Sequence, residues 1–299
     1  MVKTRLFYEI MLLVLVLVWP VAGFGADFGP VSGEICQNLY NQPPADPKLA
    51  NLVEYRASSQ NPVYVLEQNQ YLIMSFGAVH DLQSMYNPKD ELEVPLVYQR
   101  IMSIGAAYPK NLKKVLMLGL GGGRLTQYLR QYLKRAEFTV VELDPAVISV
   151  AKAHFGVQEK DKHLKIVQAD AWEYLKDSKD KFDLILVDVC VSDTVPPQVK
   201  SADFYKEVKA HLAKGGTAVQ NVSLKHYYLG EAEAAMREAF GGFDSFETDM
   251  NFILVAPEMI TKHSGVLSYR AKSRQKKYSF RYPLGELLGC FHRKEPISD

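Results

Sequence analysis

The segment from residue 115 to residue 145 constrains the fold of this chain more than any other part of the sequence. A short apolar run at residues 115–118 leads into the glycine-rich turn GLGGG at residues 119–123. Apolar residues then recur at helical spacing, and a second apolar run occupies residues 138–141. The pattern predicts a strand, a tight turn, a helix and a strand. This is half of a nucleotide-binding sheet, because a glycine turn and the free N–H groups of the next helix let a ligand approach the backbone.

The spacing of the glycines distinguishes between nucleotide ligands. A dinucleotide site requires a small residue at the sixth place of G-x-G-x-x-G, and Arg124 occupies that place. Glu142 ends the next predicted strand, nineteen residues after Gly123, where a carboxylate can accept hydrogen bonds from both hydroxyls of a ribose. The spacing is typical of proteins that bind S-adenosylmethionine or its decarboxylated form. The alternative is a glycine turn that serves only close helix packing.

Beyond residue 142 the predicted strands and helices keep alternating, which indicates a parallel sheet with helices on both faces and about seven strands. Ligands of such sheets bind at the carboxyl ends of the strands. Four acidic residues lie at or just beyond these ends: Glu142, Asp170, Asp188 and Asp193. Asp170 and the N–H of Ala171 could hold an adenine, although each acid alone could equally cap the helix that follows it.

Residues 1–26 have the pattern of a targeting segment. Lys3 and Arg5 precede a run without charged residues from residue 10 to residue 26, which ends in small residues. This pattern is typical of a secretory signal peptide cleaved near residues 23–26, so we expect a periplasmic or secreted protein. The run is shorter than the roughly 20 apolar residues that a spanning helix prefers. An uncleaved anchor, with membrane contact through this segment, is the second hypothesis, and a buried N-terminal helix is the third.

The chain has three cysteines, which do not form a disulfide framework and match no metal-binding spacing. In an oxidising compartment one pair could close. Cys36 and Cys290 are the more suitable pair, because Cys190 follows a predicted core strand. We expect all three cysteines to have structural roles.

The remaining sequence divides into three parts. We expect a small β-rich domain at residues 27–110, a Rossmann-like nucleoside-binding domain at residues 111–258 and a basic segment at residues 259–299. The basic segment carries seven cationic residues and no acid over residues 262–281. It could contact anionic lipid or nucleic acid, but we favour a solvated tail. The net charge of +1 gives no argument for a nucleic-acid partner.

Residues 115–222 resemble the spermidine synthases, or polyamine aminopropyltransferases. Four pieces carry the resemblance: GLGGG at 119–123, VVELDPAVISVAK at 140–152, QADAWEYL at 168–175 and FDLILVD at 182–188. The resemblance implies an α/β fold in which a small β-rich N-terminal domain precedes a Rossmann-like, S-adenosylmethionine-binding domain of the methyltransferase type. It also implies transfer of an aminopropyl group from decarboxylated S-adenosylmethionine to a diamine, without a prosthetic group.

The same resemblance implies which residues bind the donor. They lie in the glycine turn, at two strand ends and in the N-terminal domain: Gly119, Gly121, Gly123, Glu142, Asp170, Ala171 and Gln83. The glycines would approach the sulfonium group, Glu142 the ribose, and Asp170 with Ala171 the adenine. Gln83 with Ser84 is similar to the Q-x-T segment that lines the ligand site of the family.

The chain departs from the family on the acceptor side of the site. The loop of the family reads D-S-S/T-D-P, and its second aspartate, which takes the proton of the attacking amine, is Val191 here. An aspartate of the family's glycine turn is Gly122, and a glutamate of its preceding helix is Arg100. Asp188 and Asp193 are similar to a divergent branch of spermidine synthase-like proteins, which reads D-x-x-x-x-D in this loop.

A base is needed because an amine with a pKa of about 10 is protonated at neutral pH and has no lone pair for attack. Asp193 could replace the missing base, while Asp188 helps to present the amine. The alternative for Asp193 is a turn-forming role ahead of the Pro-Pro pair that follows it. His80, next to Asp81, is a further candidate base, for which we favour a structural role.

Three functions remain open from the sequence. The leading hypothesis is aminopropyl transfer to a diamine or polyamine. The first alternative is a methyltransferase that uses S-adenosylmethionine, with Arg124 as the candidate partner of the donor carboxylate. The second is a non-catalytic polyamine- or nucleoside-binding protein, which Val191 and the signal-like segment favour. Families of this kind often pair as dimers or tetramers, so a homodimer is possible, and no nucleic-acid partner is expected.

The predicted location conflicts with the predicted donor. Adenosylated sulfonium compounds are made in the cytosol, so an exported enzyme would be separated from them. The conflict is resolved if residues 1–26 are an anchor that leaves the fold facing the cytosol, if the donor is itself exported, or if the fold serves another use.

Overall fold

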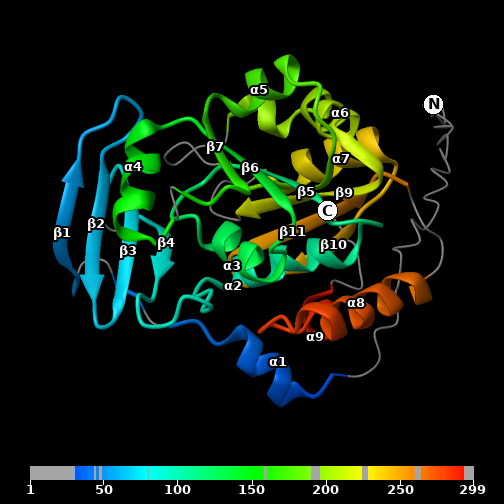
Figure 1. Cartoon of the computed structure of the whole chain (residues 1–299), viewed down its shortest axis with the longest axis horizontal. Helices are drawn as coiled ribbons and strands as arrows, with labels where there is room; N and C mark the ends of the chain where they lie inside the picture. The colour runs from blue at the N-terminus through cyan, green and yellow to red at the C-terminus, as the bar shows by residue number, and fades with distance from the viewer. Residues whose placement is uncertain are drawn as a thin grey trace, which may run out of the picture.

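A seven-stranded mixed sheet with the strand order β10-β11-β9-β8-β5-β6-β7 forms the centre of the fold (Figure 1). The computed structural model describes residues 31–43, 45–46, 49–79, 81–157, 160–189, 196–223, 228–259 and 264–292. The strands are β5 (Lys114–Leu118), β6 (Glu137–Glu142), β7 (Leu164–Gln168), β8 (Phe182–Val187), β9 (Leu212–Ser223), β10 (Asp244–Glu247) and β11 (Asn251–Pro257). Strands β5 to β9 pair in parallel, whereas β11 pairs antiparallel with β9 and with β10. The predicted α/β class and seven strands are confirmed.

Helices cover both faces of this sheet and enclose two apolar layers. One layer includes side chains of α2 (Val97–Met102), η2 (Ser103–Ala107), α3 (Arg124–Tyr132), α8 (Ser264–Tyr278) and α9 (Leu284–Phe291). The other includes side chains of α5 (Ala171–Asp177), α6 (Ala202–Ala210) and α7 (Leu229–Phe240), with η3 (Pro197–Lys200) beside them. Successive side chains of β5 point to opposite faces of the sheet, so Val115 and Met117 lie in the first layer and Leu116 and Leu118 lie in the second.

A separate antiparallel sheet of four strands precedes the central sheet in the chain and lies beside α4 (Pro145–His154) (Figure 1). Its strands are β1 (Asn51–Arg56), β2 (Val63–Gln68), β3 (Tyr71–Phe76) and β4 (Leu82–Tyr86). Val63, Val65 and Met74 share a buried cluster with Val147 and Phe155 from the region of α4. The predicted small β-rich N-terminal unit is confirmed, and this cluster fixes it against the central unit.

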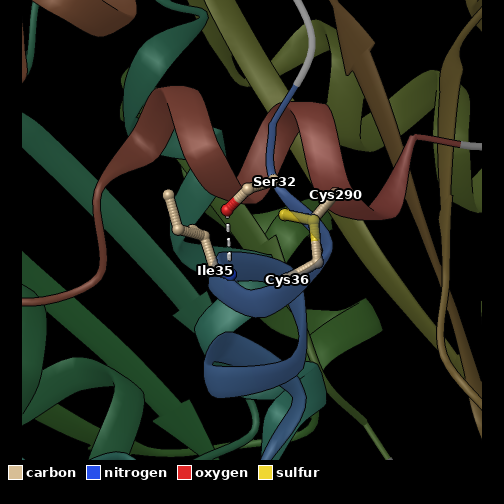
Figure 2. The surroundings of a disulfide bond; sticks show 4 residues. All are labelled: Ser32, Ile35, Cys36 and Cys290. Carbon is tan, nitrogen blue, oxygen red and sulfur yellow. Dashed lines mark hydrogen bonds between the residues drawn. A yellow bond between two sulfur atoms is a disulfide. The ribbon is translucent and has the colours of Figure 1, made fainter.

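The N-terminal helix α1 (Gly33–Tyr40) is held against the C-terminal helix α9 by a disulfide. The helix begins after Ser32, whose Oγ accepts a hydrogen bond from the N–H of Ile35 at 3.3 Å. Cys36 of α1 is bonded to Cys290 of α9, as Figure 2 shows, and their Cα atoms are 5.3 Å apart. The pairing favoured from the sequence is therefore present.

The basic C-terminal segment is not the solvated tail that we expected. It forms α8, which packs together with α9 against η2. Arg270 donates to the carbonyl of Tyr108, and Arg274 donates to the carbonyls of Ala106 and Pro109. Burial lowers the pKa of Arg274 to about 10. The expectation was wrong because two of the cations satisfy carbonyl groups at the end of η2, while Ala271 and Phe280 join the core.

Several predicted features lie outside the described residues, namely the targeting segment at residues 1–26, His80, Cys190, Val191 and Asp193. Within the part of the chain that the structure describes, the helices lack the length and hydropathy needed to span a membrane.

Candidate functional site

The register of the parallel strands brings the predicted ligand residues to one edge of the sheet. Leu118 pairs with Val141 and with Val187, so the glycine turn, the end of β6 and the end of β8 lie side by side. A cavity of about 280 Å³ opens there, close to the lower limit of roughly 300 Å³ for small-molecule sites. Its lining includes residues from the turn, the strand ends and the small sheet: Gly119, Leu120, Gly121, Glu142, Asp170, Ala171, Trp172, Asp188, Gln83, Asn61 and Phe76.

The glycine turn is shaped by two close approaches of its backbone. Gly119 has a φ of 90°, and a Cβ atom there would lie 2.2 Å from the carbonyl oxygen of Asp188. A Cβ atom at Gly122 would lie 2.4 Å from Oγ of Ser84, so the aspartate of related sequences has no room at this place. Gly121 has open space at its Cβ position and lines the cavity, whereas Gly123 lies against Val157 and does not line it.

Glu142 lies under the turn with its carboxylate bound to main-chain N–H groups. Oε2 accepts a hydrogen bond from Leu120 N at 2.8 Å, and Oε1 accepts one from Asp144 N at 2.9 Å. Burial raises the pKa of Glu142, and these main-chain hydrogen bonds act in the opposite direction. Because a carboxylate oxygen accepts more than one hydrogen bond, both oxygens can also serve the hydroxyls of a ligand.

Asp170 caps a helix and also lines the first cavity. Its Oδ1 accepts hydrogen bonds from the N–H groups of Trp172 and Glu173, at 2.8 and 3.1 Å, and thereby caps α5. The same residue lines the cavity together with Ala171, whose N–H is one of the groups that a helix leaves unpaired at its start. The cap orients the carboxylate and leaves Oδ2 for a ligand.

Asp188 is fixed by two side chains that the sequence analysis did not identify. Its Oδ2 accepts a hydrogen bond from Tyr98 Oη at 3.2 Å, and its Oδ1 accepts one from Asn221 Nδ2 at 2.8 Å. Asn221 in turn accepts from Asn251 Nδ2 at 3.0 Å. Burial raises the pKa of Asp188, and the hydrogen bonds from Asn221 and Tyr98 oppose that rise. Two signals in the sequence could have identified them: Tyr98 lies two residues before Arg100, in the helix compared with the family, and Asn221 lies near the end of β9.

A second cavity, of about 410 Å³, shares a wall with the first at Gln83, Tyr98, Asp188 and Val189. Its other lining residues come from the end of α1, the small sheet, the starts of α2 and α7, β9 and the β10–β11 turn: Tyr40, Gln42, Asp81, Leu82, Leu96, Val97, Asn221, Ser223, Tyr228, Thr248, Asp249, Met250 and Asn251. Three carboxylates and no lysine or arginine occur among the described lining residues. Such a lining favours a cationic ligand.

Gln83 lies at the junction of the two cavities and contacts one of these carboxylates. Its Nε2 donates a hydrogen bond to Oδ2 of Asp81 at 3.0 Å, and it lines both cavities. The geometry thus places Gln83 within reach of ligands on either side of the shared wall.

Arg100 does not take part in either cavity. It is 4% exposed, and its guanidinium donates to the carbonyls of Leu39, Asn41, Val94 and Pro95. Arg100 stands where the family has a glutamate, but its side chain does not enter the acceptor side of the site. The side chain points away from the site and attaches the segment around the end of α1 to the start of α2.

Arg124 is also excluded as a partner for a donor carboxylate. It is 2% exposed, donates to the carbonyls of Phe155 and Glu91, and stacks on the ring of Tyr86 at 4.3 Å. Arg124 is absent from the lining of the first cavity. The suggestion made from its place in the glycine motif is wrong because the helix turns this side chain toward the small sheet.

Across the described residues, groups of three or more histidine, cysteine, aspartate or glutamate side chains that could hold a metal ion do not occur. The loop that follows Asp188 carries the predicted base Asp193 and lies outside the described residues. Carboxylates, amides and main-chain N–H groups are among the polar groups that the described residues bring to the two cavities.

Comparison with known proteins agrees with this geometry. A family model for the spermine/spermidine synthase domain matches residues 95–267. A polyamine aminopropyltransferase from Chromobacterium violaceum is 31% identical over 159 residues, which cover 53% of this chain and 60% of the relative. The chain thus spans less than two thirds of the length of that relative.

Solved structures share the fold at low sequence identity. A spermidine synthase in complex with the transition state analogue AdoDATO has a TM-score of 0.66 at 16% identity, covering 81% of this chain and 85% of that chain. Human methyltransferase-like protein 13 in complex with SAH has a TM-score of 0.52 at 22% identity, covering 60% of this chain and 92% of that chain. The predicted Rossmann-like, methyltransferase-type fold is confirmed. Because the family model covers more than half of the sequence, the chain belongs to the spermine/spermidine synthase family.

Proposed function

We propose that the protein transfers an aminopropyl group from decarboxylated S-adenosylmethionine to a diamine or polyamine. The observation that carries the proposal is the meeting of two unlike cavities at Asp188. In the reaction, the nitrogen of the amine attacks the propyl carbon next to the sulfonium sulfur. The N–C bond forms as the C–S bond breaks, the electron pair stays on sulfur, and methylthioadenosine leaves.

The first cavity suits the nucleoside part of the donor. Glu142 accepts hydrogen bonds from the two ribose hydroxyls, since each of its carboxylate oxygens is already oriented by one main-chain N–H group. Oδ2 of Asp170 accepts a hydrogen bond from the exocyclic amine of the adenine, and the N–H of Ala171 donates one to a ring nitrogen. The backbone of Gly119 and Gly121 lies along the sulfonium part of the donor.

The second cavity suits the acceptor. Its three carboxylates attract a protonated amine, and Asp188 stands where the two cavities meet. The raised pKa of Asp188 makes its carboxylate a stronger proton acceptor than an exposed aspartate. Because Asp188 lines both cavities, we assign to it the binding of the attacking nitrogen, and we assign removal of the nitrogen's proton to Asp193, five residues further along the chain.

A methyltransferase that uses S-adenosylmethionine is the second candidate. The fold shared with methyltransferase-like protein 13 favours it. The burial of Arg124 removes the residue that would have met the extra carboxylate of that donor. No arginine or lysine lies among the described residues that line the first cavity, which favours the decarboxylated donor.

We also propose that the protein acts in an oxidising compartment, to which residues 1–26 direct it, and that the donor is exported to the same compartment. Two independent features support this location: the charge-free run that ends in small residues, and the disulfide between Cys36 and Cys290. The test is cell fractionation of the full-length chain together with mass spectrometry of its N-terminus. Recovery in the cytosolic fraction with Cys36 reduced would contradict the proposal.

Calorimetric titration tests the proposed ligands. Methylthioadenosine, decarboxylated S-adenosylmethionine, S-adenosylmethionine and spermidine are titrated separately into the purified protein. We expect the decarboxylated donor to bind more tightly than the carboxylated one. The reverse order would support the methyltransferase, and absence of nucleoside binding would exclude both enzymes. Spermidine binding without nucleoside binding would identify a polyamine-binding protein.

A further inference from the structure

One wall of the second cavity comes from the N-terminal segment of the chain. Tyr40 and Gln42, at and just beyond the end of α1, line this cavity. Gln42 Oε1 accepts a hydrogen bond from Val97 N at 3.2 Å, and Tyr40 Oη accepts one from Asp249 N at 2.9 Å. The segment thereby joins the start of α2 to the β10–β11 turn and closes the cavity between them.

Helix α1, which leads into this wall, buries little apolar surface of its own. It has eight residues, of which only Leu39 is buried. An isolated helix of this length is not stable in water, so the position of α1 depends on contacts with other elements. Arg100 donates to the carbonyls of Leu39 and Asn41, and the ring of Tyr40 stacks on Phe291 at 5.9 Å.

The covalent contact is the disulfide between Cys36 and Cys290 (Figure 2). Cys290 belongs to α9, which is firmly placed because Leu284, Leu287 and Leu288 are fully buried. The bond joins cysteines that are 254 positions apart in the sequence, so it links α1 covalently to an element that lies at the other end of the described chain. It attaches α1 to the core one helical turn before Tyr40.

We infer that the Cys36–Cys290 disulfide is a positioning element of the amine site, which holds Tyr40 and Gln42 in the wall of the second cavity. The inference rests on the proposed function, because it takes the second cavity as the acceptor site. Residues of α1 do not line the first cavity, so breaking the bond leaves the donor site intact. Reduction by a dithiol adds two electrons and two protons, yields the two cysteine thiols, and turns the reductant into its own disulfide.

The test compares amine binding and nucleoside binding in the oxidised and reduced protein. Putrescine or spermidine, and separately methylthioadenosine, are titrated into the full chain before and after reduction with dithiothreitol, and into the Cys36→Ser and Cys290→Ser variants. We expect the Kd for the amine to rise about tenfold or more in all three reduced or substituted forms. The Kd for methylthioadenosine should change less than twofold, which also shows that the variants are folded. Dithiothreitol should have no further effect on either variant.

Two further measurements separate a positioning role from a general loss of stability. Hydrogen exchange should become faster in residues 33–42 after reduction and remain unchanged around residues 115–145. Tyr40→Ala should raise the Kd for the amine in the oxidised protein, whereas Tyr269→Ala, at a tyrosine that is 72% exposed on α8, should not.

The outcomes distinguish failure of this inference from failure of the proposed function. If the oxidised protein binds both ligands and reduction changes the amine Kd less than twofold, the inference is wrong and the function stands. If the oxidised protein binds neither ligand, the proposed function is wrong. If reduction raises the Kd for the amine and the Kd for methylthioadenosine by the same factor, the disulfide has a general stabilising role and the inference is overturned.

Discussion

The two cavities that meet at Asp188 are built in opposite ways. The first is centred on the ends of neighbouring parallel strands, where the turn after β5 and the end of β6 present main-chain N–H groups and Glu142, while the small sheet and the start of α5 complete its lining. The second is made from side chains of remote segments, including Tyr40, Asp81 and Asp249. A site made of backbone and regular strands is rigid by construction. A site assembled from distant segments depends on whatever holds those segments together.

The largest expected effect is that of Asp188→Asn, which removes the charge shared by both cavities. We expect kcat/KM for the amine to fall by about 30-fold to several thousand-fold, since loss of one partner of a buried charge pair costs roughly 2–5 kcal/mol. The donor Kd should rise less than this, because Glu142 and Asp170 still hold the nucleoside. Steady-state kinetics with varied amine provide the measurement, and Asp203→Asn, at an exposed acid of α6, is the matched control. Unchanged amine kinetics would show that Asp188 does not bind the amine.

Glu142→Ala should affect the other cavity alone. We expect the Kd for methylthioadenosine to rise about 100-fold or more, because two hydrogen bonds to a charged group are each worth roughly 1.5–3 kcal/mol. Calorimetry is the readout, with Glu137→Ala as control at the opposite end of the same strand, where the side chain is exposed. A similar loss of amine affinity would show that the two cavities are not independent.

Arg100→Met should lower both the stability of the protein and the affinity of the second cavity for the amine, although Arg100 does not line that cavity. Four carbonyl groups lose their donor, so we expect the free energy of unfolding to fall by roughly 2–4 kcal/mol. In the folded protein the amine Kd should rise about tenfold, since Leu39 and Asn41 are released beside Tyr40. Urea unfolding and calorimetry measure the two effects, with Arg135→Met at an exposed site as control. A change in nucleoside affinity instead would contradict the separate construction of the cavities.

The smallest expected effect is that of Tyr98→Phe, which removes one hydrogen bond to Asp188. That bond lowers the pKa of Asp188 against the rise caused by burial, so its loss should raise the pKa further. The carboxylate then forms at higher pH than before, and amine affinity should decline on acidification at a higher pH than in the unchanged protein. At neutral pH we expect a loss of about two- to tenfold. Amine titrations between pH 4 and pH 8 are the measurement, with Tyr55→Phe on β1 as control; an unchanged or lower pH of decline would refute the role of Tyr98.

Sequence reasoning succeeded where local pattern and structure coincide. The glycine turn, the seven strands and the position of Glu142 at a strand end all follow from periodicity and from the rule that parallel strands end at one edge. Asp170 was found for the same reason. The predicted Cys36–Cys290 pair rested on excluding a cysteine next to a core strand, and the structure contains that pair.

The remainder depended on contacts between remote residues. Arg100, Arg124 and Arg274 were interpreted through motif position or charge, yet all three donate to backbone carbonyls that lie far away in the sequence or on another element. The second cavity could not be predicted, because Tyr40 and Asp249 meet only after α1 and the β10–β11 turn have packed. Nothing in local periodicity indicates such a meeting.

A product assay on the purified, oxidised protein decides whether it transfers aminopropyl groups. Decarboxylated S-adenosylmethionine and putrescine are incubated with it, and methylthioadenosine and the aminopropylated amine are quantified by mass spectrometry. We expect the two products in equal amounts, and their loss in the Asp188→Asn variant. Absence of both products from a protein that binds both ligands, or formation of S-adenosylhomocysteine when S-adenosylmethionine is supplied instead, would contradict aminopropyl transfer.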